Sequence, residues 1–285
     1  MRQVFTSCAI INTSMTFVEK LTAAVEKNNS LLCVGIDPDV TKLPEDYDQL
    51  RFSKAIVDAT AGLVCAFKPN PAFFEAQGAE GIQALKDVCD YIKHEYPEIP
   101  LIFDFKRGDI GNTNAQYAKF AFDYIGADAV TYQIYMGIEP LEPLLAYADK
   151  AVFALVRTSN PGGGEVQDLI VDGKPLYEYL TEKAANEWNK SGNLMLVAGA
   201  TYPAELAKMR QIAGDDMIFL VPGVGTQGAD PETVIKAGLN SKGTGLIINA
   251  SRSIIFASNS DNFAEVARDK ATELRDEINS YRGES

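Results

Sequence analysis

Three charged side chains of alternating sign follow a short apolar run near the middle of the chain. The run, residues 100–103, leads directly into Asp104, Lys106 and Asp109. If the run is a buried strand, its period of two places Asp104 and Lys106 on the same face. Because buried charges are costly unless they are paired, this spacing indicates either a satisfied ion pair or a site where chemistry requires the charges.

A second lysine, Lys68, ends another apolar run and needs a counter-charge if it points into the protein interior. Asp104, at the end of the next predicted strand, can provide that charge, and Lys106 and Asp109 continue an alternating array. In such an array each carboxylate keeps the neighbouring lysine protonated. Asp37 follows an earlier apolar run, and its position is equally compatible with this site and with a simple turn before Pro38.

Two later segments are typical of a phosphate-binding site. Gly223, Gly225 and Gly228 would let backbone N–H groups approach an anion, and Arg252 offers a planar guanidinium for phosphate oxygens. The alternative is that the glycine-rich segment only reverses the chain. Because Arg252 follows the neighbouring predicted strand, we favour phosphate binding.

Ser159 lies just before a second glycine-rich segment, residues 162–164. A segment of this composition is too flexible to be a core element. We therefore expect a loop that covers a bound ligand.

Eight apolar runs without polar alternation are suited to buried parallel strands. They are residues 31–36, 63–67, 101–105, 127–132, 151–156, 194–198, 217–221 and 246–249. Helical patterns follow them at 51–63, 71–96, 115–125, 137–148, 176–190, 203–213, 230–237 and 261–281, and an additional helix is expected at 16–27. This alternation predicts an α/β fold, a single-domain (β/α)8 TIM barrel over residues 15–285, with a doubly wound open sheet as the alternative.

The barrel prediction agrees with the distribution of polar residues. Chemistry in such barrels takes place at the C-terminal ends of the strands, and the unusual polar residues follow strands one, two, three, five, seven and eight. We interpret residues 1–14 as a disordered or added lead-in, with Met15 as a possible working start. That lead-in has only a short apolar patch and does not resemble a signal peptide.

The composition disfavours several classes of partner. The chain has 285 residues and a net charge of −13, from 26 basic and 39 acidic side chains. Such a balance disfavours nucleic-acid and anionic-membrane binding and suits a cytoplasmic protein. No apolar run approaches the length of a membrane span of roughly 18 to 20 residues.

The cysteines and the single histidine also limit the chemistry. Cys8, Cys33, Cys65 and Cys89 are far apart, so we expect buried reduced thiols and neither a disulfide framework nor a zinc site. His94 lies near a predicted helix end, where we expect it to be solvated. Sites that depend on several histidines, or on a histidine-containing triad, are therefore hard to build.

The chain resembles the orotidine 5′-monophosphate decarboxylase family, in particular its longer bacterial branch (type 2), from about Thr16 onward. The family signature D-x-K-x-x-D-I-x-x-T is present as Asp104, Lys106, Asp109, Ile110 and Thr113. Further matching positions are Asp37, Lys68, Ser159, Gln227 and Arg252. The family's G-R-[SP]-I motif differs here, because Ser251 replaces its glycine while Arg252 is retained.

The resemblance implies a role for each matching position. The catalytic charges would be Lys68, Asp104, Lys106 and Asp109. The residues that reach across a homodimer interface into the partner's site would be Asp109, Ile110 and Thr113. Asp37 and Lys68 would hold ribose hydroxyls, and Ser159 would contact the pyrimidine edge. The phosphate would be held by Gln227 and Arg252, beside Gly223, Gly225 and Ser251.

The implied reaction is the loss of CO2 from C6 of orotidine 5′-monophosphate to give UMP, the last step of UMP synthesis, without a metal or organic cofactor. Lys106 would protonate C6. Because the site would be shared between subunits, we expect an isolated monomer to be inactive.

Three other functions remain as alternatives. A related phosphosugar barrel, such as a hexulose phosphate synthase or ketogulonate phosphate decarboxylase, uses Mg²⁺ and places an acid where this chain has Lys68. A Schiff-base aldolase needs a neutral lysine, whereas Asp104 and Asp109 favour a charged Lys106. A non-catalytic nucleotide-binding barrel would not need four mutually dependent charges.

Overall fold

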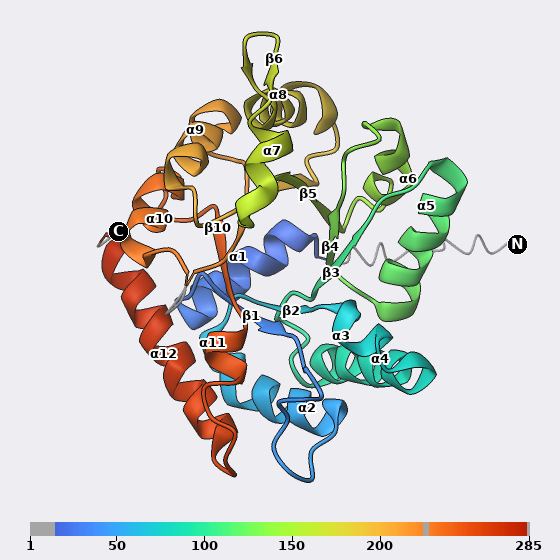
Figure 1. The fold of residues 1–285 in the computed structure, drawn as a ribbon, viewed down its shortest axis with the longest axis vertical. Helices are drawn as coiled ribbons and strands as arrows, with labels where there is room; N and C mark the ends of the chain where they lie inside the picture. Colours follow the sequence, from blue (N-terminus) through green and yellow to red (C-terminus); the bar gives the residue numbers. More distant parts are fainter. Residues whose placement is uncertain (1–14, 225–227, 284–285) are drawn as a thin grey trace, which may run out of the picture.

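The computed structural model describes residues 15–224 and 228–283 of the chain (Figure 1). Eight parallel strands form one sheet in the order β2-β1-β10-β9-β8-β5-β4-β3. Their bounds are β1 Leu32–Ile36, β2 Ala66–Pro69, β3 Ile102–Arg107, β4 Ala129–Tyr132, β5 Ala151–Arg157, β8 Leu194–Ala198, β9 Phe219–Pro222 and β10 Leu246–Ala250. A parallel bridge between Phe67 and Leu101 links β2 to β3, so the sheet closes into a barrel.

All eight predicted strands are present, and the barrel prediction is confirmed over the open sheet. Every residue of β1, β8 and β10 is buried. These strands are covered on both faces, by the barrel interior and by the surrounding helices, which explains why their sequences are continuously apolar.

Helices surround the barrel (Figure 1). Those after the first four strands are α2 Gln49–Thr60, α3 Pro71–Glu75, α4 Gly78–Glu95, α5 Gly111–Ala118 and α6 Glu142–Leu145. The later ones are α7 Gly164–Gln167, α8 Leu176–Lys183, α9 Pro203–Ala213, α10 Pro231–Gly238, α11 Arg252–Ile255 and α12 Phe263–Tyr281. Short 3₁₀ or π segments extend this framework at η1 Ala61–Leu63, η2 Lys119–Ile125, η3 Glu139–Leu141, η4 Pro161–Gly163 and η5 Ala184–Trp188.

The predicted N-terminal helix is present as α1 Phe17–Asn28, and it lies at the N-terminal end of the strands. A capping box at Thr16 starts it. The Phe17 ring packs edge-on against Phe153 of β5, and Lys20 forms a 2.7 Å ion pair with Asp128, just before β4. Because α1 covers this end of the barrel, the opposite, C-terminal mouth is the end left for a site.

Two predicted helices were wrong in extent, and one hairpin was not predicted. The predicted helix 71–96 is broken between α3 and α4, where Gly78 adopts a left-handed φ of 66°. The predicted helix 137–148 is reduced to the short η3 and α6 segments, each with a proline at its start. The loop after β5 contains an unpredicted hairpin of β6 Ile170–Val171 and β7 Lys174–Pro175, which projects from the barrel in Figure 1.

The remaining sequence expectations concern the cysteines, the single histidine, the N-terminal residues and membrane spans. Cys33, Cys65 and Cys89 are buried free thiols, as predicted, and burial raises the pKa of Cys89 to about 12. His94 is exposed at the end of α4, also as predicted. Cys8 and the proposed lead-in 1–14 lie outside the described residues. Among the helices described, none is long and apolar enough to cross a membrane.

Candidate active site

The charged cluster predicted around Asp104 is present at the C-terminal mouth of the barrel. One carboxylate oxygen of Asp104, Oδ2, accepts a 2.6 Å hydrogen bond from Lys68 Nζ. The other, Oδ1, accepts a 2.5 Å hydrogen bond from Lys106 Nζ. Lys68 comes from β2 and the other two residues from β3, so the strand order brings together residues that are distant in sequence.

Burial and charge act in opposite directions on this cluster. Burial alone would raise the pKa of Asp104, but the neighbouring ammonium groups of Lys68 and Lys106 outweigh it and hold the pKa well below its usual range. Burial alone would lower the pKa of Lys68, but the carboxylates of Asp104 and Asp37 outweigh it and raise the pKa above its usual range. The buried pair is therefore charged at neutral pH.

The strand geometry at Lys106 differs from the regular alternation predicted by a period of two. Lys106 has a left-handed φ of 44°, and the pairing of β3 with β4 shifts register between Phe103 and Arg107. Its side chain is 45% exposed, whereas Asp104 is buried. The ammonium still reaches Asp104, and its position at the mouth leaves it accessible to a ligand.

Thr131 of β4 joins the two β3 residues, and sequence reasoning did not single it out. Its hydroxyl donates to Asp104 Oδ1 at 2.8 Å and accepts from the Lys106 backbone N–H at 3.1 Å. Thr131 is buried, so this one hydroxyl fixes the carboxylate and the unusual backbone conformation together. A lone threonine in an apolar strand carries no spacing signal from which this role could have been predicted.

Asp109 does not take part in the ion pairs of Asp104 within this chain. Its carboxylate accepts the backbone N–H of Ile110 at 2.7 Å, at the entrance to α5. The Asp109 backbone N–H donates to the buried side chain of Asn114, which in turn donates to the Tyr132 hydroxyl at 2.6 Å. Asn114 therefore holds the segment that carries Asp109, another role that sequence reasoning missed.

Ile110 and Thr113 lie on the same segment as Asp109, at the start of α5. Ile110 is 60% exposed, an unusual position for an isoleucine. The backbone N–H of Thr113 donates to the Ile110 carbonyl, so the two residues belong to a single helical turn. In the isolated chain Ile110 is therefore open to solvent, and Asp109 and Thr113 are partly exposed.

Asp37 lies beside the lysine of the cluster. It follows β1, whose last residue Ile36 pairs with Pro69, next to Lys68. Its Oδ1 atom is buried and has no hydrogen-bond partner among the described residues. A buried, unpaired carboxylate oxygen at the barrel mouth favours a contact with ligand hydroxyls over the simple turn.

The predicted phosphate site is described only in part. Gly223 follows β9 with a φ of 95°, and Ser251 and Arg252 follow β10, the neighbouring strand. Arg252 is exposed at the mouth. Gly225 and Gln227 lie outside the described residues.

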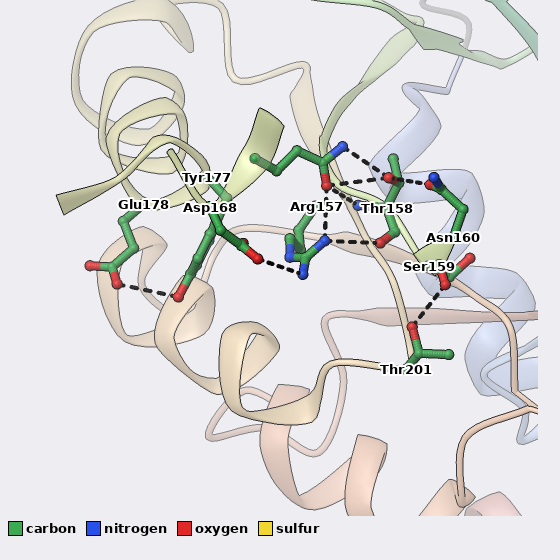
Figure 2. Close-up of polar contacts among 9 residues, drawn as sticks. Arg157, Thr158, Ser159, Asn160, Asp168, Tyr177, Glu178 and Thr201 are labelled. Carbon is green, nitrogen blue, oxygen red and sulfur yellow. Dashed lines mark hydrogen bonds and ion pairs between the residues drawn. The ribbon is translucent and has the colours of Figure 1, made fainter. Parts of the chain in front are cut away.

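Ser159 lies close to Gly223, which places the predicted ligand-covering loop beside the predicted phosphate site. A Cβ atom added to Gly223 would lie 3.5 Å from Ser159 Cβ. Thr201, in the loop after β8, donates its hydroxyl to the Ser159 carbonyl at 3.1 Å (Figure 2). The loops after β5, β8 and β9 therefore meet at Ser159.

The described part of the chain contains no group of three or more His, Cys, Asp or Glu side chains placed to hold a metal ion. At the end of β2, where the Mg²⁺-dependent alternative needs an acid, Lys68 is already paired with Asp104. The chemistry that this mouth offers is the stabilisation of negative charge by two ammonium groups.

Comparisons with known proteins place the chain among similar sequences. A model of the orotidine 5′-phosphate decarboxylase / HUMPS family matches residues 30–267. The orotidine 5′-phosphate decarboxylase of Ralstonia pickettii is 51% identical over 273 residues, covering 94% of this chain and 100% of that protein. That of Dechloromonas aromatica is 52% identical with the same coverage.

Solved structures show the same similarity. The Leishmania donovani OMP decarboxylase matches with a TM-score of 0.83 and 38% identity, covering 95% of this chain and 100% of that chain. A putative orotidine-monophosphate-decarboxylase from Toxoplasma gondii matches with a TM-score of 0.84 and 38% identity, covering 94% and 96%. The similarity therefore extends over nearly the whole barrel.

Proposed function

The chain belongs to the orotidine 5′-phosphate decarboxylase family, and we propose that the charged cluster of Lys68, Asp104 and Lys106 carries its reaction. The enzyme decarboxylates orotidine 5′-monophosphate to UMP and CO2. The observation that supports this assignment of the site is the buried Asp104 carboxylate, which has a lysine ammonium on each of its oxygens.

The proposed reaction begins with the substrate carboxylate close to Asp104. Two like charges repel each other, and the repulsion is relieved when the bond from C6 to the carboxylate carbon breaks and neutral CO2 departs. The electron pair of that bond remains on C6. The Lys106 ammonium stabilises this carbanion and then donates a proton to C6, which gives UMP and a neutral lysine that regains its proton from solvent.

The ribose and pyrimidine contacts are part of the same proposal. Asp37 has an unpaired carboxylate oxygen beside Lys68, so these two side chains would bind ribose hydroxyls. Ser159 would contact the pyrimidine edge, because its loop lies over the mouth next to Gly223. Each contact orients the nucleotide so that C6 faces Lys106.

We assign phosphate binding to the ends of β9 and β10. Arg252 supplies the charge, with Ser251 beside it and Gly223 on the neighbouring loop. Barrels frequently bind phosphate after these two strands of the series. Gly225 and Gln227 would complete the site, although they lie outside the described residues.

A homodimer completes the proposed site. The Asp109 carboxylate accepts the backbone N–H of Ile110 and forms no ion pair with Lys68 or Lys106 of its own chain, and Ile110 is exposed. Tyr135 and Met136, in the loop after β4, are also exposed, at 92% and 51%. These features support an apolar interface through which Asp109, Ile110 and Thr113 reach the site of a second subunit.

One assay tests the proposed function. The purified protein is incubated with orotidine 5′-monophosphate and EDTA, and UMP is quantified. We expect metal-independent UMP formation, whereas tight nucleotide binding without product would indicate a non-catalytic barrel.

A cytoplasmic location belongs to the same proposal, because the three described cysteines are free thiols.

A further inference from the structure

Arg157 is a buried charged side chain that the proposed reaction does not use. It is the last residue of β5, lies two positions before Ser159, and is only 2% exposed. Its guanidinium stacks on the ring of Tyr202, 3.8 Å from the centroid. Tyr202 lies in the loop after β8, immediately before α9, so this contact joins two neighbouring loops of the barrel mouth. A guanidinium is costly to bury, and its position therefore requires specific partners.

The partners of Arg157 come from both ends of the loop that carries Ser159 (Figure 2). At the near end, Nη1 donates to the Thr158 carbonyl at 3.4 Å. At the far end, Nη1 donates to Gln167 Oε1 at 3.1 Å and Nη2 donates to Asp168 Oδ2 at 3.3 Å. Gln167 Oε1 also accepts the Thr158 backbone N–H at 2.9 Å. Arg157 and Gln167 therefore fasten the far end of the loop to its beginning.

At Ser159 the loop packs closely against Gly199, at the end of the neighbouring strand β8. A Cβ atom on Gly199, which follows β8, would lie 2.6 Å from the Ser159 backbone nitrogen, so only glycine permits this approach. The Thr201 hydroxyl holds the Ser159 carbonyl from the same side. Ser159 is therefore held on one side by Gly199 and Thr201 and on the other by the loop that Arg157 binds.

The two partners of the Arg157–Asp168 ion pair differ in burial. The arginine is buried, whereas Asp168, its one carboxylate partner among the residues that the structure describes, is 46% exposed at the surface. The Arg157 Nε atom is also buried without a hydrogen-bond partner among the described residues. A fully satisfied structural ion pair would have neither feature. Water can therefore compete for the contact at the far end of the loop, whereas the arginine itself is buried.

We propose that Arg157 is a positioning residue that holds the loop over residues 158–168 closed and thereby places Ser159 against the pyrimidine. The proposal rests on the proposed function, because it acts through the contact of Ser159 with the substrate. In this role Arg157 acts through Ser159 and is not itself a catalytic residue.

A double-mutant cycle tests the proposal. We expect Arg157→Met to lower kcat/KM for orotidine 5′-monophosphate by about 10- to 100-fold, the range for removing hydrogen bonds made by a charged group. Arg157→Lys keeps the positive charge but lacks the planar guanidinium with its two terminal nitrogen donors. It should therefore lower kcat/KM less than Arg157→Met does. In a Ser159→Ala background, Arg157→Met should cost less than about threefold, because residues that act as a unit are not additive.

Two surface variants keep the test decisive if Arg157→Met folds poorly. Asp168→Asn weakens the far end of the loop while the arginine remains in place, and it should lower kcat/KM by about threefold to tenfold. Glu165→Gln is the matched control, because Glu165 lies on the same loop and, within the part of the chain that the structure describes, forms no hydrogen bond or ion pair with Arg157; it should leave kcat/KM unchanged. Urea unfolding of each variant establishes that it is folded.

The outcomes separate this inference from the proposed function. If wild-type protein forms UMP and the effects of Arg157→Met and Ser159→Ala simply multiply, the arginine has only a structural role and the inference is wrong. An Asp168→Asn variant with wild-type kcat/KM would contradict it as well. If wild-type protein forms no UMP, the proposed function itself fails.

Discussion

Lys68 Nζ lies 2.6 Å from Oδ2 of Asp104, and both side chains are buried where β2 and β3 open into the barrel mouth. Each charge offsets the free-energy cost of burying the other. The pKa of Asp104 is lowered and that of Lys68 is raised, so neither group titrates near neutral pH. The stabilisation from Asp104 is lost only as the pH falls through its lowered pKa, and that from Lys68 only as the pH rises through its raised pKa.

Asp104→Asn should destabilise the protein more at neutral pH than at alkaline pH. Without its main counter-charge, burial lowers the pKa of Lys68 below the unfolded value, so stability should rise as the pH increases. We expect a loss of about 3–5 kcal/mol at pH 7, the range for leaving one partner of a buried pair, and a smaller loss at about pH 9. Urea unfolding at both pH values measures this, with exposed Asp276→Asn as the control. Equal losses at the two pH values would contradict the prediction.

Thr131→Val should impair turnover more than binding. The substitution keeps the shape of the side chain but removes the hydroxyl that joins Asp104 to the Lys106 backbone. We expect kcat to fall by about tenfold, with a change in KM of less than about threefold. Steady-state kinetics measures both, and Thr131→Ser, which keeps the hydroxyl, should retain most of the activity. A Thr131→Val enzyme with wild-type kcat would show that the hydroxyl is dispensable.

Arg252→Ala should lower kcat/KM although the phosphate that it is proposed to bind is remote from C6 in the substrate. Binding of a remote phosphate can be used to order the charged site, so its loss appears in the transition state as well as in binding. We expect a decrease of several kcal/mol in transition-state stabilisation, on the order of 10³-fold or more in kcat/KM. Arg268→Ala, an exposed arginine of α12, is the control. Near-normal kcat/KM in Arg252→Ala would refute the phosphate assignment.

Two inactive variants should restore activity to each other when mixed. If Asp109 serves the partner's site, a dimer of one Lys106→Ala and one Asp109→Ala subunit contains one site in which both residues are intact. Random subunit exchange should therefore recover about a quarter of wild-type activity. The mixture is assayed after a cycle of dissociation and reassociation. No recovery, with exchange confirmed by differently tagged subunits, would place Asp109 in its own subunit's site.

The sequence was sufficient to predict the strand order and the contact that depends on it. Eight apolar runs predicted the barrel, and adjacency of the second and third strands predicted that Lys68 meets Asp104. The hairpin of β6 and β7 was missed although Asp172-Gly173, both with positive φ, is a typical hairpin turn. Its two-residue strands are too short to produce a hydrophobic period.

The residues that support the site could not be predicted in the same way. Thr131 and Asn114 act through single hydrogen bonds to residues on other elements, and no spacing in the sequence encodes those contacts. The role of Arg157 has no sequence signal either, because its partners Gln167 and Asp168 are ten and eleven positions away and become neighbours only through the fold of the loop. Polar contacts of this kind depend on tertiary geometry.

The assignment of Lys106 as the proton donor to C6 is the central claim, and the Lys106→Ala variant tests it most directly. UMP binding and UMP formation are measured on the same preparation, with the exposed Lys190→Ala as the matched control. We expect Lys106→Ala to bind nucleotide and form no detectable UMP, while Lys190→Ala behaves as the wild type. Substantial turnover by a folded, nucleotide-binding Lys106→Ala enzyme would contradict the assignment.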